Sequence, residues 1–343
     1  MLIAHVNVAR DYRGGERQTE LLMRELAALG TRQRLIARRG RMLARRIKEN
    51  GFEVREVSGH LPGVVMATRG ADLVHVHEGR SVYAAYLRHR MSRTPYVATR
   101  RVTNPIGDHY FAHRAYCAAA RVVAITPQVA DVVRDFDPGV RLSVILSSSS
   151  GLESNSEQAR AIRRSAGDGF IVGHIGALDN DQKAQDTIIA AARVLESSHP
   201  DIHFLLVGGG KDEAMLRELA SGLSNLSFAG FVTNVGDFLA ALDILVLPSR
   251  REGMGSILFD AMEHSLPIVA TPVGGVPRIV FEDQNGYLID VDEPEQLAER
   301  IVRLRSDPAL RERLGATGRR MACGHTPPAM AEAYLKVYES VLE

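Results

Sequence analysis

Two acidic side chains flank a glycine-containing turn in the second half of the chain. Glu252 comes directly before Gly-Met-Gly-Ser, and Asp260 follows at the spacing of the first turns of a helix. Backbone N–H groups at a helix start lack intrahelical partners, so they favour an anion or a hydroxyl-rich ligand. A ligand that combines a sugar, a diphosphate and a ribose would suit this arrangement. The alternative interpretation is an acidic helix cap with a second, exposed acid, because carboxylates are common at helix starts.

The residues around these two acids predict the elements that hold them in place. Residues 244–247 form an apolar run short enough for a buried strand, which Pro248 ends. Apolar side chains recur at helical spacing over residues 256–264, with Asp260 on the opposite, polar side. Residues 267–270 form a second apolar run, which completes a strand–helix–strand unit of a parallel sheet.

This stretch resembles the carboxyl-terminal signature of the family 4 glycosyltransferases of the GT-B fold, an E-x7-E pair set in P-S-x-x-E-G-x-G. Here it reads PSRREGMG, with Glu252 as the first acid and Asp260 in place of the second glutamate. The resemblance implies that Glu252 is catalytic and that Asp260 holds the ribose hydroxyls of a nucleotide. Because aspartate is one methylene shorter than glutamate, it must reach further or act through water. The resemblance implies donor-binding roles for four residues between the acids: Met254, Gly255, Ser256 and Ile257.

Two further segments of the second half resemble donor-binding parts of the same family. Lys183 takes the lysine position of a G-R-L-x(n)-K-G pattern that clamps the donor diphosphate, whereas Ala177 stands at the arginine position. The resemblance therefore makes Lys183 a catalytic residue that contacts the leaving phosphates. Phe231 and Val232 lie in a turn similar to the G-F/Y-V turn whose backbone reads the nucleotide base.

A glycine pair, Gly14 and Gly15, lies near the amino terminus, where an apolar run gives way to a helical pattern. It resembles the GG-x-E/R loop that covers the donor phosphates in the same family. Two residues without Cβ atoms let the backbone approach a ligand closely, and the helix start adds partial positive charge. A simple tight turn is the alternative. No G-x-G-x-x-G pattern is present, which weighs against a nicotinamide-binding start.

Two histidines alternate near the end of a strand predicted over residues 71–78. Their spacing places His75 and His77 on one side of the strand, but no third ligand is evident, so we do not expect a metal site. Similar proteins carry D-x-x-H-x-H at this point, where the strand ends beside the acceptor cleft. The resemblance makes Glu78 and Arg80 candidates for contacts with the acceptor.

Two arginines follow a strand predicted over residues 95–99. Many relatives have P-x-V-x-T-x-H here, with the histidine near the reacting sugar, and Arg101 occupies the position of that histidine. Arginine cannot act as a general base, but it can stabilise a leaving phosphate or bind an anionic acceptor. We therefore expect Arg101 in the catalytic site and Arg100 on the acceptor side.

The chain of 343 residues, 45% hydrophobic and 24% charged, is long enough for two domains. Alternating strand and helix patterns predict an α/β protein, and the resemblance implies a GT-B fold with two doubly wound Rossmann-like domains facing a central cleft. We expect an acceptor-binding domain over residues 1–150, a serine-rich linker over 151–168 and a donor-binding domain over 169–326. The resemblance implies that an amphipathic helix over 327–343 packs back on the first domain.

Charge is distributed unevenly along the chain. Residues 1–150 hold 24 Lys and Arg against 13 Asp and Glu, and the rest of the chain holds 18 against 28. Residues 32–48 alone contain eight basic and no acidic side chains. Such a stretch is either a solvated face or a surface for an anionic lipid or acceptor. No nucleic-acid-binding motif accompanies it, so we expect no nucleic-acid partner.

The sequence also predicts where the protein is located. No apolar run approaches the ~20 residues of a membrane-spanning helix, and the first ten residues read as a strand rather than a signal peptide. Cys117 and Cys323 match no metal or redox spacing, which favours a reducing compartment. We expect a cytoplasmic protein that can contact the inner face of the cytoplasmic membrane.

The resemblance implies a retaining hexosyltransferase that moves a sugar from a UDP- or GDP-linked donor to an envelope glycan, either lipopolysaccharide core or a lipid-linked saccharide. We assign no D-x-D pair as a metal anchor, so we expect neither a cofactor nor a metal. One alternative is a sugar-nucleotide epimerase on the same fold, for which no acid/base residues can be assigned. Another is a non-catalytic GT-B module that binds a partner or a membrane through its arginine-rich face.

Overall fold

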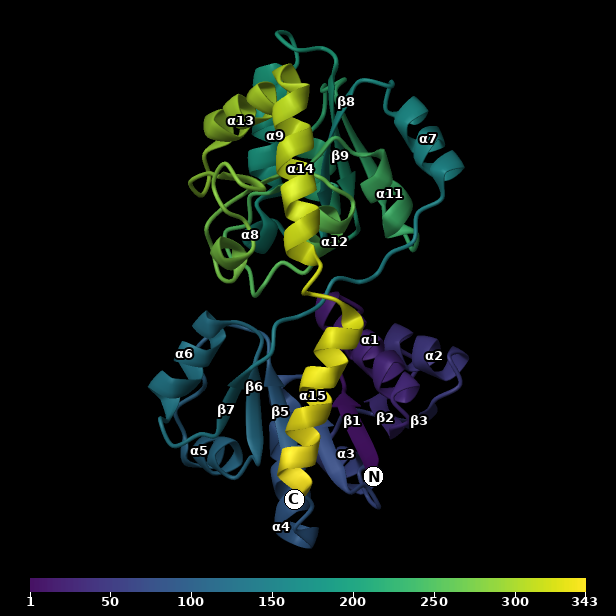
Figure 1. Cartoon of the computed structure of the whole chain (residues 1–343), viewed down its shortest axis with the longest axis vertical. Coiled ribbons are helices and arrows are strands. Elements are labelled where there is room, and N and C mark those ends of the chain that lie inside the picture. The colour runs from purple at the N-terminus through teal and green to yellow at the C-terminus, as the bar shows by residue number, and fades with distance from the viewer. The chain divides into compact units, whose positions relative to one another are not determined.

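Two parallel β-sheets, each covered by helices, organise the chain (Figure 1). The computed structural model describes residues 1–343. Met1–Ser148 and His325–Glu343 form one unit, called the N-terminal unit here, and Ser149–Gly324 form the C-terminal unit. The expectation of two doubly wound Rossmann-like domains is confirmed. No helix of the chain combines the length and the apolar character that crossing a membrane requires.

The N-terminal unit is built on a seven-stranded sheet in the order β3-β2-β1-β4-β5-β6-β7, with every pairing parallel. Its central strands are buried on both faces, because helices cover both sides. The strands are β1 (Leu2–Asn7), β2 (Arg32–Arg38), β3 (Glu53–Val57), β4 (Leu73–Val76), β5 (Tyr96–Arg100), β6 (Arg121–Ala124) and β7 (Leu142–Val144).

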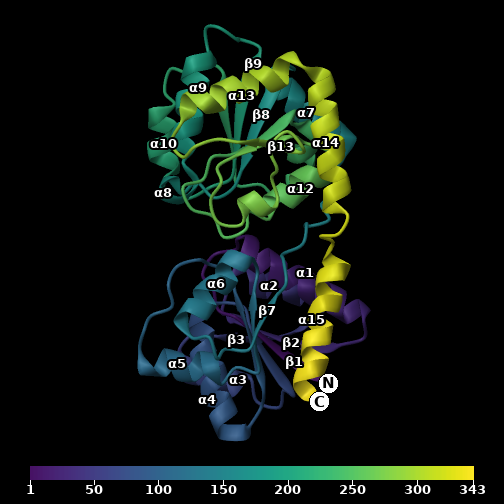
Figure 2. The ribbon, with the colours of Figure 1, turned by 60° about the vertical axis from the view of Figure 1, so that its left-hand side comes forward.

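Helices cover the two faces of this sheet in two groups (Figure 2). The helices α1 and α15 pack together on one face, and α3, α4 and α5 pack together on the other. The helical segments are α1 (Gly14–Ala28), α2 (Met42–Glu49), α3 (Leu61–Ala67), η1 (Gly79–Ser81), α4 (Val82–Ser92), α5 (Tyr110–Cys117), α6 (Pro127–Phe136) and α15 (Pro327–Leu342).

The last helix, α15, belongs to the N-terminal unit although it comes from the end of the chain. Thr326 caps its start, because the side-chain oxygen accepts a hydrogen bond from the Ala329 N–H, and Pro327 follows at the first helical position. Tyr334 and Tyr338 are buried in the same apolar cluster as residues of α1 and β1. The amphipathic pattern of this segment thus serves to bury one face against the sheet.

The C-terminal unit has a six-stranded parallel sheet in the order β10-β9-β8-β11-β12-β13. The helices α9 and α13 pack together over its central strands and bury one apolar cluster with them. The strands are β8 (Phe170–Ile175), β9 (Ile202–Val207), β10 (Leu226–Gly230), β11 (Ile244–Leu247), β12 (Ile268–Ala270) and β13 (Gly286–Leu288). The helical segments are α7 (Ser156–Ser165), α8 (Asn180–Lys183), α9 (Gln185–Leu195), α10 (Glu213–Leu219), α11 (Val235–Ala241), α12 (Ile257–Glu263), η2 (Val276–Arg278), α13 (Pro294–Ser306) and α14 (Pro308–Ala322).

The segment over residues 151–168 differs from the expected linker. It contains α7, whose first turn is capped by Asn155 and which packs on α11. Arg163 of this helix donates hydrogen bonds to the carbonyl oxygens of Ala241 and Gly169 and pairs with Asp243. These contacts make the segment part of the C-terminal unit, and the boundary between the units falls between residues 148 and 149.

Candidate active site

In the C-terminal unit the strand order reverses between β8 and β11, which lie side by side at the centre of the sheet. Ligands of open α/β sheets bind at such a switch point, beyond the carboxyl ends of the strands. Lys183 lies in the segment that follows β8, and Glu252 lies in the loop that follows β11. The topology therefore brings two of the three expected catalytic residues to the same place.

Lys183 and Glu252 form an ion pair at this switch point. Lys183 Nζ lies 2.5 Å from Glu252 Oε2, and the Ser249 hydroxyl donates to the same carboxylate oxygen over 3.3 Å. The side chains are only 15% and 9% exposed, so the attraction is less screened than at a surface. An ammonium group has three N–H donors, and the pair to Glu252 leaves others for a ligand. Sequence reasoning selected both residues but did not predict that they pair.

The loop after β12 holds the turn at Glu252 in place. Gly274 has a φ of +54°, and a Cβ atom there would lie 1.8 Å from the carbonyl oxygen of Glu252, so only glycine fits. The next N–H, from Gly275, donates to the Gly253 carbonyl oxygen at 2.9 Å, and the Thr271 hydroxyl donates to the Ser249 carbonyl oxygen over 2.5 Å. These backbone contacts fix the direction of the Glu252 side chain.

The sequence pattern placed Asp260 on the polar side of its helix, but the structure buries this residue. It is 3% exposed, and its carboxylate accepts hydrogen bonds from the backbone N–H and the hydroxyl of Ser150, the latter at 3.1 Å. The neighbouring Ser149 hydroxyl donates to Glu263 over 2.6 Å. The first residues of the C-terminal unit, Ser149 and Ser150, are thereby attached to α12. If Asp260 binds a ribose, its carboxylate does so while it also accepts hydrogen bonds from Ser150.

We expect Asp260→Ala to destabilise the C-terminal unit by roughly 1–3 kcal/mol, because it removes the acceptor of two buried Ser150 donors. Urea denaturation measures this loss. Calorimetry of UDP and GDP binding then separates the two roles of the carboxylate. If Asp260 also holds the ribose, affinity falls at least tenfold further in Asp260→Ala than in Ser150→Ala, which loses only the hydroxyl contact. Equal affinities in the two variants would remove Asp260 from the ribose site.

The other expected donor-binding residues lie at the same edge of the sheet. Phe231 and Val232 follow β10, and the Phe231 side chain is 59% exposed beside the Gly209 turn that follows β9. Met254 and Gly255 are buried within the turn after β11. Ser256 and Ile257 are half-buried at the start of α12.

Three D-x-D stretches, over residues 135–137, 179–181 and 290–292, were not assigned from the sequence, and the last two lie in the C-terminal unit. Asp179 and Asp181 follow β8, and Lys211 pairs with both of them, at 3.2 and 3.3 Å. The stretch over residues 290–292 follows β13, and its last aspartate pairs with Arg250 at 2.6 Å. Asp179 and Asp181 thus share one ammonium group, and the last aspartate has a guanidinium partner.

In the N-terminal unit the strand order reverses between β1 and β4. Gly14 and Gly15 open α1 just after β1, and Arg101 comes directly after β5. A Cβ atom at Gly15 would lie 3.3 Å from Arg101 Cδ, so the glycine turn and this arginine are neighbours. The structure therefore groups the expected phosphate loop with the expected third catalytic residue.

The three residues expected on the acceptor side, Glu78, Arg80 and Arg100, differ in burial and in their partners. Glu78 caps η1, because its carboxylate accepts hydrogen bonds from the Arg80 N–H at 2.9 Å and from the Ser81 hydroxyl. The Arg80 side chain is exposed. Arg100 is buried, and its guanidinium donates to the carbonyl oxygen of Asn104. Arg100 therefore stabilises the loop after β5.

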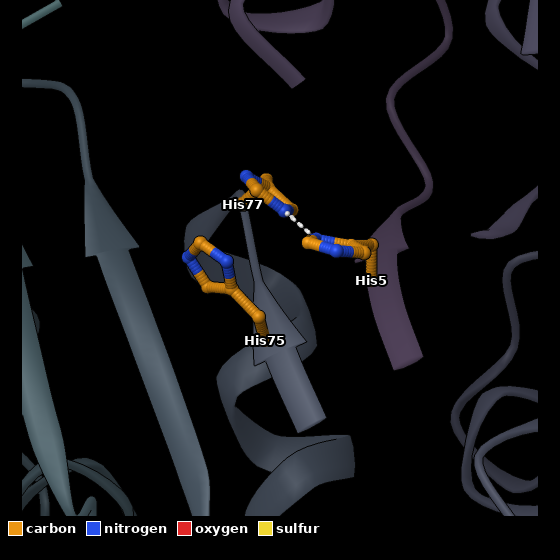
Figure 3. A group of neighbouring side chains, drawn as sticks. All are labelled: His5, His75 and His77. Atoms are coloured by element: carbon orange, nitrogen blue, oxygen red, sulfur yellow. Dashed lines mark hydrogen bonds between the residues drawn. The ribbon is translucent and has the colours of Figure 1, made fainter. Parts of the chain in front are cut away.

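A third histidine joins the pair expected on β4, which corrects the sequence analysis (Figure 3). His5 of β1 lies opposite His75 in the parallel register. The His5 Nδ1 and His77 Nε2 atoms are 2.9 Å apart and share a hydrogen bond. All three side chains are at most 2% exposed, and the nitrogen atoms that could bind a metal lie within 4.8 Å of one another. Sequence spacing missed His5 because the strand pairing, not the local sequence, brings it close.

Both ring nitrogen atoms of His75 are hydrogen-bonded to hydroxyl groups. His75 Nε2 pairs with the Thr99 hydroxyl at 2.7 Å, and His75 Nδ1 pairs with the Tyr338 hydroxyl at 2.7 Å. Burial lowers the pKa of His5 to about 3 and the pKa values of His75 and His77 well below the ordinary value, and the charge of Arg101 lowers the last two further. The same positive charge opposes a bound metal cation. The cluster is a neutral polar contact that attaches α15 to the sheet.

Comparison with known proteins extends over the whole chain. Residues 169–307 match the family model described as glycosyl transferases group 1. The lipopolysaccharide core biosynthesis glycosyltransferases LpsD and LpsE of Rhizobium meliloti are 27% and 26% identical, covering 99% of this chain and 98% and 99% of theirs. Among solved structures, Anabaena Alr3699/HepE in complex with UDP-glucose has a TM-score of 0.88 at 18% identity, covering 99% of this chain and all of its own. The sucrose-phosphate synthase of Thermosynechococcus elongatus has a TM-score of 0.84 at 20% identity, covering 99% of each chain.

Proposed function

We propose that this chain is a GT-B glycosyltransferase that transfers a sugar from a UDP- or GDP-linked donor to a glycan of the bacterial cell envelope, because residues 169–307 match the group 1 glycosyl transferase family model and two relatives covering 99% of the chain are named glycosyltransferases. The proposed transfer retains the anomeric configuration and needs no divalent cation. The observation that carries the proposal is the Lys183–Glu252 ion pair at the switch point of the C-terminal sheet. Two relatives that match the chain over its full length are named for lipopolysaccharide core biosynthesis, which supports a core saccharide or a lipid-linked saccharide as acceptor.

The proposed reaction proceeds by attack on the same face from which the nucleotide leaves. An acceptor hydroxyl oxygen forms the new bond to the anomeric carbon, the bond from that carbon to the phosphate oxygen breaks, and the leaving phosphate takes the hydroxyl proton. Lys183 balances the negative charge that grows on the diphosphate, and Glu252 holds the Lys183 ammonium and contacts the transferred sugar. In the N-terminal unit, Arg101 and the Gly14–Gly15 turn are neighbours and offer positive charge to a phosphate. No basic side chain has to remove a proton in this scheme.

Two features of the chain support independence from divalent cations. The aspartates at positions 179 and 181 are paired with Lys211, so a metal ion would have to displace an ammonium group from them. Lys183 offers the leaving diphosphate a positive charge from the protein itself. We expect turnover to be unchanged when EDTA replaces added Mg²⁺ or Mn²⁺.

A panel of UDP- and GDP-linked sugars tests the proposal by release of nucleoside diphosphate. Release that increases when a deacylated envelope oligosaccharide is added supports transfer, and retention is read from the anomeric coupling constants of the product by NMR. Interconversion of sugar nucleotides without acceptor would instead support the epimerase alternative. If neither release nor interconversion occurs with any donor, the chain acts as a non-catalytic module.

We propose that the basic stretch over residues 32–48 also makes peripheral contact with an anionic membrane. The stretch forms β2 and α2, where three of its arginines have structural partners. Arg34 pairs with Glu53 at 2.5 Å, Arg46 pairs with Glu20 at 2.8 Å, and Arg38 donates to the Ser58 carbonyl oxygen at 3.1 Å. The exposed cations are Arg32, Arg39, Arg41, Arg45 and Lys48. Each exposed cation near an anionic surface contributes about 1 kcal/mol at low salt.

Replacement of the exposed cations, with the ion-paired arginines left intact, tests this contact. We expect sedimentation with phosphatidylserine vesicles at low salt to fall at least tenfold in the quadruple variant R39S, R41S, R45S and K48S, and to weaken in the wild type as salt rises. A matched quadruple variant in the C-terminal unit, R160S, R164S, R319S and R320S, removes the same charge from exposed helix positions. Equal loss in both variants would show that net charge alone is responsible, and the stretch would then be a solvated face.

A further inference from the structure

A hollow of about 440 Å³ lies in the N-terminal unit, beyond the carboxyl ends of its central strands. Val8 follows β1, Gly59 follows β3, and Ser81 lies in η1 after β4, so the hollow adjoins the switch point between β1 and β4. His109 and Phe111, from the segment that follows β5, form another side. Its volume lies within the range of small-molecule sites, and its place is where α/β sheets bind ligands.

The inner surface of this pocket is apolar and aromatic. Val64 of α3 and Ala84 of α4 line it as buried residues. The rings of Tyr83 and Phe111 are nearly parallel, with centroids 5.5 Å apart and an angle of 25° between their planes. Phe111 is 39% exposed although it is a large apolar side chain. Aromatic faces of this kind suit the C–H face of a sugar ring, whose hydroxyl groups then point to the rim.

Positive charge lies at the edge of the pocket. Arg80 lines it, is exposed, and makes no ion pair through its guanidinium. A second guanidinium, from Arg38, lies over Gly59, where a Cβ atom would be 3.1 Å from Arg38 Nη2. The acid beside them, Glu78, is held by the Arg80 N–H and the Ser81 hydroxyl, so its oxygen atoms point at its own backbone turn. An uncommitted guanidinium beside an aromatic surface is suited to a carboxylate or a phosphate.

We infer that this pocket binds an anionic sugar unit of the acceptor, one that carries a carboxylate or a phosphate group. The sugar ring stacks on Tyr83 and Phe111, and Arg80 pairs with the anionic group. This inference rests on the proposed function, since it names the class of acceptor that the enzyme uses. A neutral sugar would leave the Arg80 guanidinium without a partner, so the pocket distinguishes acceptors by charge.

Saturation-transfer NMR on the full chain tests the inference without any transfer reaction. The probes are D-glucuronate, D-glucose 6-phosphate and D-glucose, which share a ring and differ in charge. We expect the wild type to bind one or both anionic sugars at least tenfold more tightly than glucose, and the preferred probe tells a carboxylate site from a phosphate site. In Arg80→Gln this preference is lost. Phe111→Ala weakens all three probes together, because it removes the stacking surface.

Arg90→Gln is the matched control, since Arg90 is an exposed arginine of the neighbouring α4 that does not line the pocket. Equal binding of glucose and the anionic sugars, an unchanged preference in Arg80→Gln, or no saturable binding of any probe would each overturn the inference. Nucleoside diphosphate release is measured separately on the wild type. Charge-selective sugar binding without such release would support the pocket and refute the proposed transferase activity. Release without charge-selective binding would support the transferase activity and refute the pocket.

Discussion

Lys183→Ala is expected to lower turnover by at least 10²-fold, equivalent to about 3 kcal/mol of transition-state stabilisation. The ammonium group lies at the switch point of the C-terminal sheet, 2.5 Å from Glu252. As the sugar–phosphate bond breaks, negative charge grows on the diphosphate, and a fixed cation stabilises that charge more than it stabilises the ground state. Ala177 offers no second cation at the neighbouring position of the family pattern. Steady-state release of nucleoside diphosphate at saturating donor measures the effect.

The same substitution leaves Glu252 without its partner, so stability must be measured beside turnover. The Glu252 side chain is only 9% exposed, and an uncompensated buried carboxylate destabilises a fold by several kcal/mol. Glu252→Gln combined with Lys183→Ala removes both charges and restores stability, so turnover that stays low in the stable double variant reflects the lost chemistry of this pair rather than misfolding. A double variant with both stability and turnover restored would show that Lys183 acts only as the partner of Glu252.

Lys211→Ala provides the matched control for Lys183→Ala. Lys211 lies nearby, pairs with Asp179 and Asp181, and is 56% exposed, so it offers the same charge in a solvated position. We expect its turnover to stay within about threefold of the wild type, because a screened surface charge contributes little. Turnover of Lys183→Ala near the wild-type value would show that another cation balances the leaving diphosphate.

The sequence predicts the elements around the donor-side acids closely, because there the local pattern decides the structure. The strand expected at residues 244–247 has those bounds, and the helix expected over 256–264 spans Ile257–Glu263. An apolar run that ends in proline, followed by glycines, admits few alternatives. The prediction that Asp260 lies on a polar side of its helix, away from the core, was wrong, since a helical wheel shows only the near neighbours in sequence. The hydrogen bonds from Ser150 come from a residue 110 positions away.

Contacts between distant segments account for the other differences. The histidine cluster depends on the pairing of β1 with β4, which places His5 opposite His75, and no spacing rule connects residues 70 positions apart. Its contact with Tyr338 depends further on the return of α15 to the first sheet. The expected linker over residues 151–168 has a composition typical of a loop, but α7 buries one face against α11. Composition alone does not show such a partner.

Acidification is expected to destabilise the N-terminal unit more steeply than the C-terminal unit between pH 6.5 and about pH 4.5. His5, His75 and His77 are buried, and their pKa values in the folded protein lie well below 6.5, at about 3 for His5. Below pH 6.5 the unfolded chain binds three protons that the folded unit does not, so the free energy of unfolding falls as the pH falls. Each such proton contributes about 1.4 kcal/mol per pH unit, or about 4 kcal/mol per unit for three.

The C-terminal unit has one fully buried histidine of this kind, His174, whose pKa burial lowers to about 4. Burial also lowers the pKa of His203 in the C-terminal unit and of His325 in the N-terminal unit, so these two act in the same direction in each unit. His113, on the surface of the N-terminal unit, acts in the opposite direction, because hydrogen bonds to Asp108 and Asp137 raise its pKa. The difference between the units therefore comes from the cluster beneath α15.

Hydrogen-exchange mass spectrometry at several pH values, corrected for the intrinsic exchange rate, measures the two units separately in one sample. We expect peptides of β1 and β4 to lose protection with a slope about two protons steeper than that of peptides of β8 and β9. His77→Gln should lower the first slope by about one proton, while His60→Gln, at an exposed position of the same unit, should leave it unchanged. A domain is stable by only about 5–15 kcal/mol, so a loss of about 6 kcal/mol by pH 5 removes much of that margin. Equal slopes in the two units would show that the three histidines are protonated within the folded N-terminal unit, and that the Tyr338 and Thr99 hydroxyls accept hydrogen bonds from a charged His75 there.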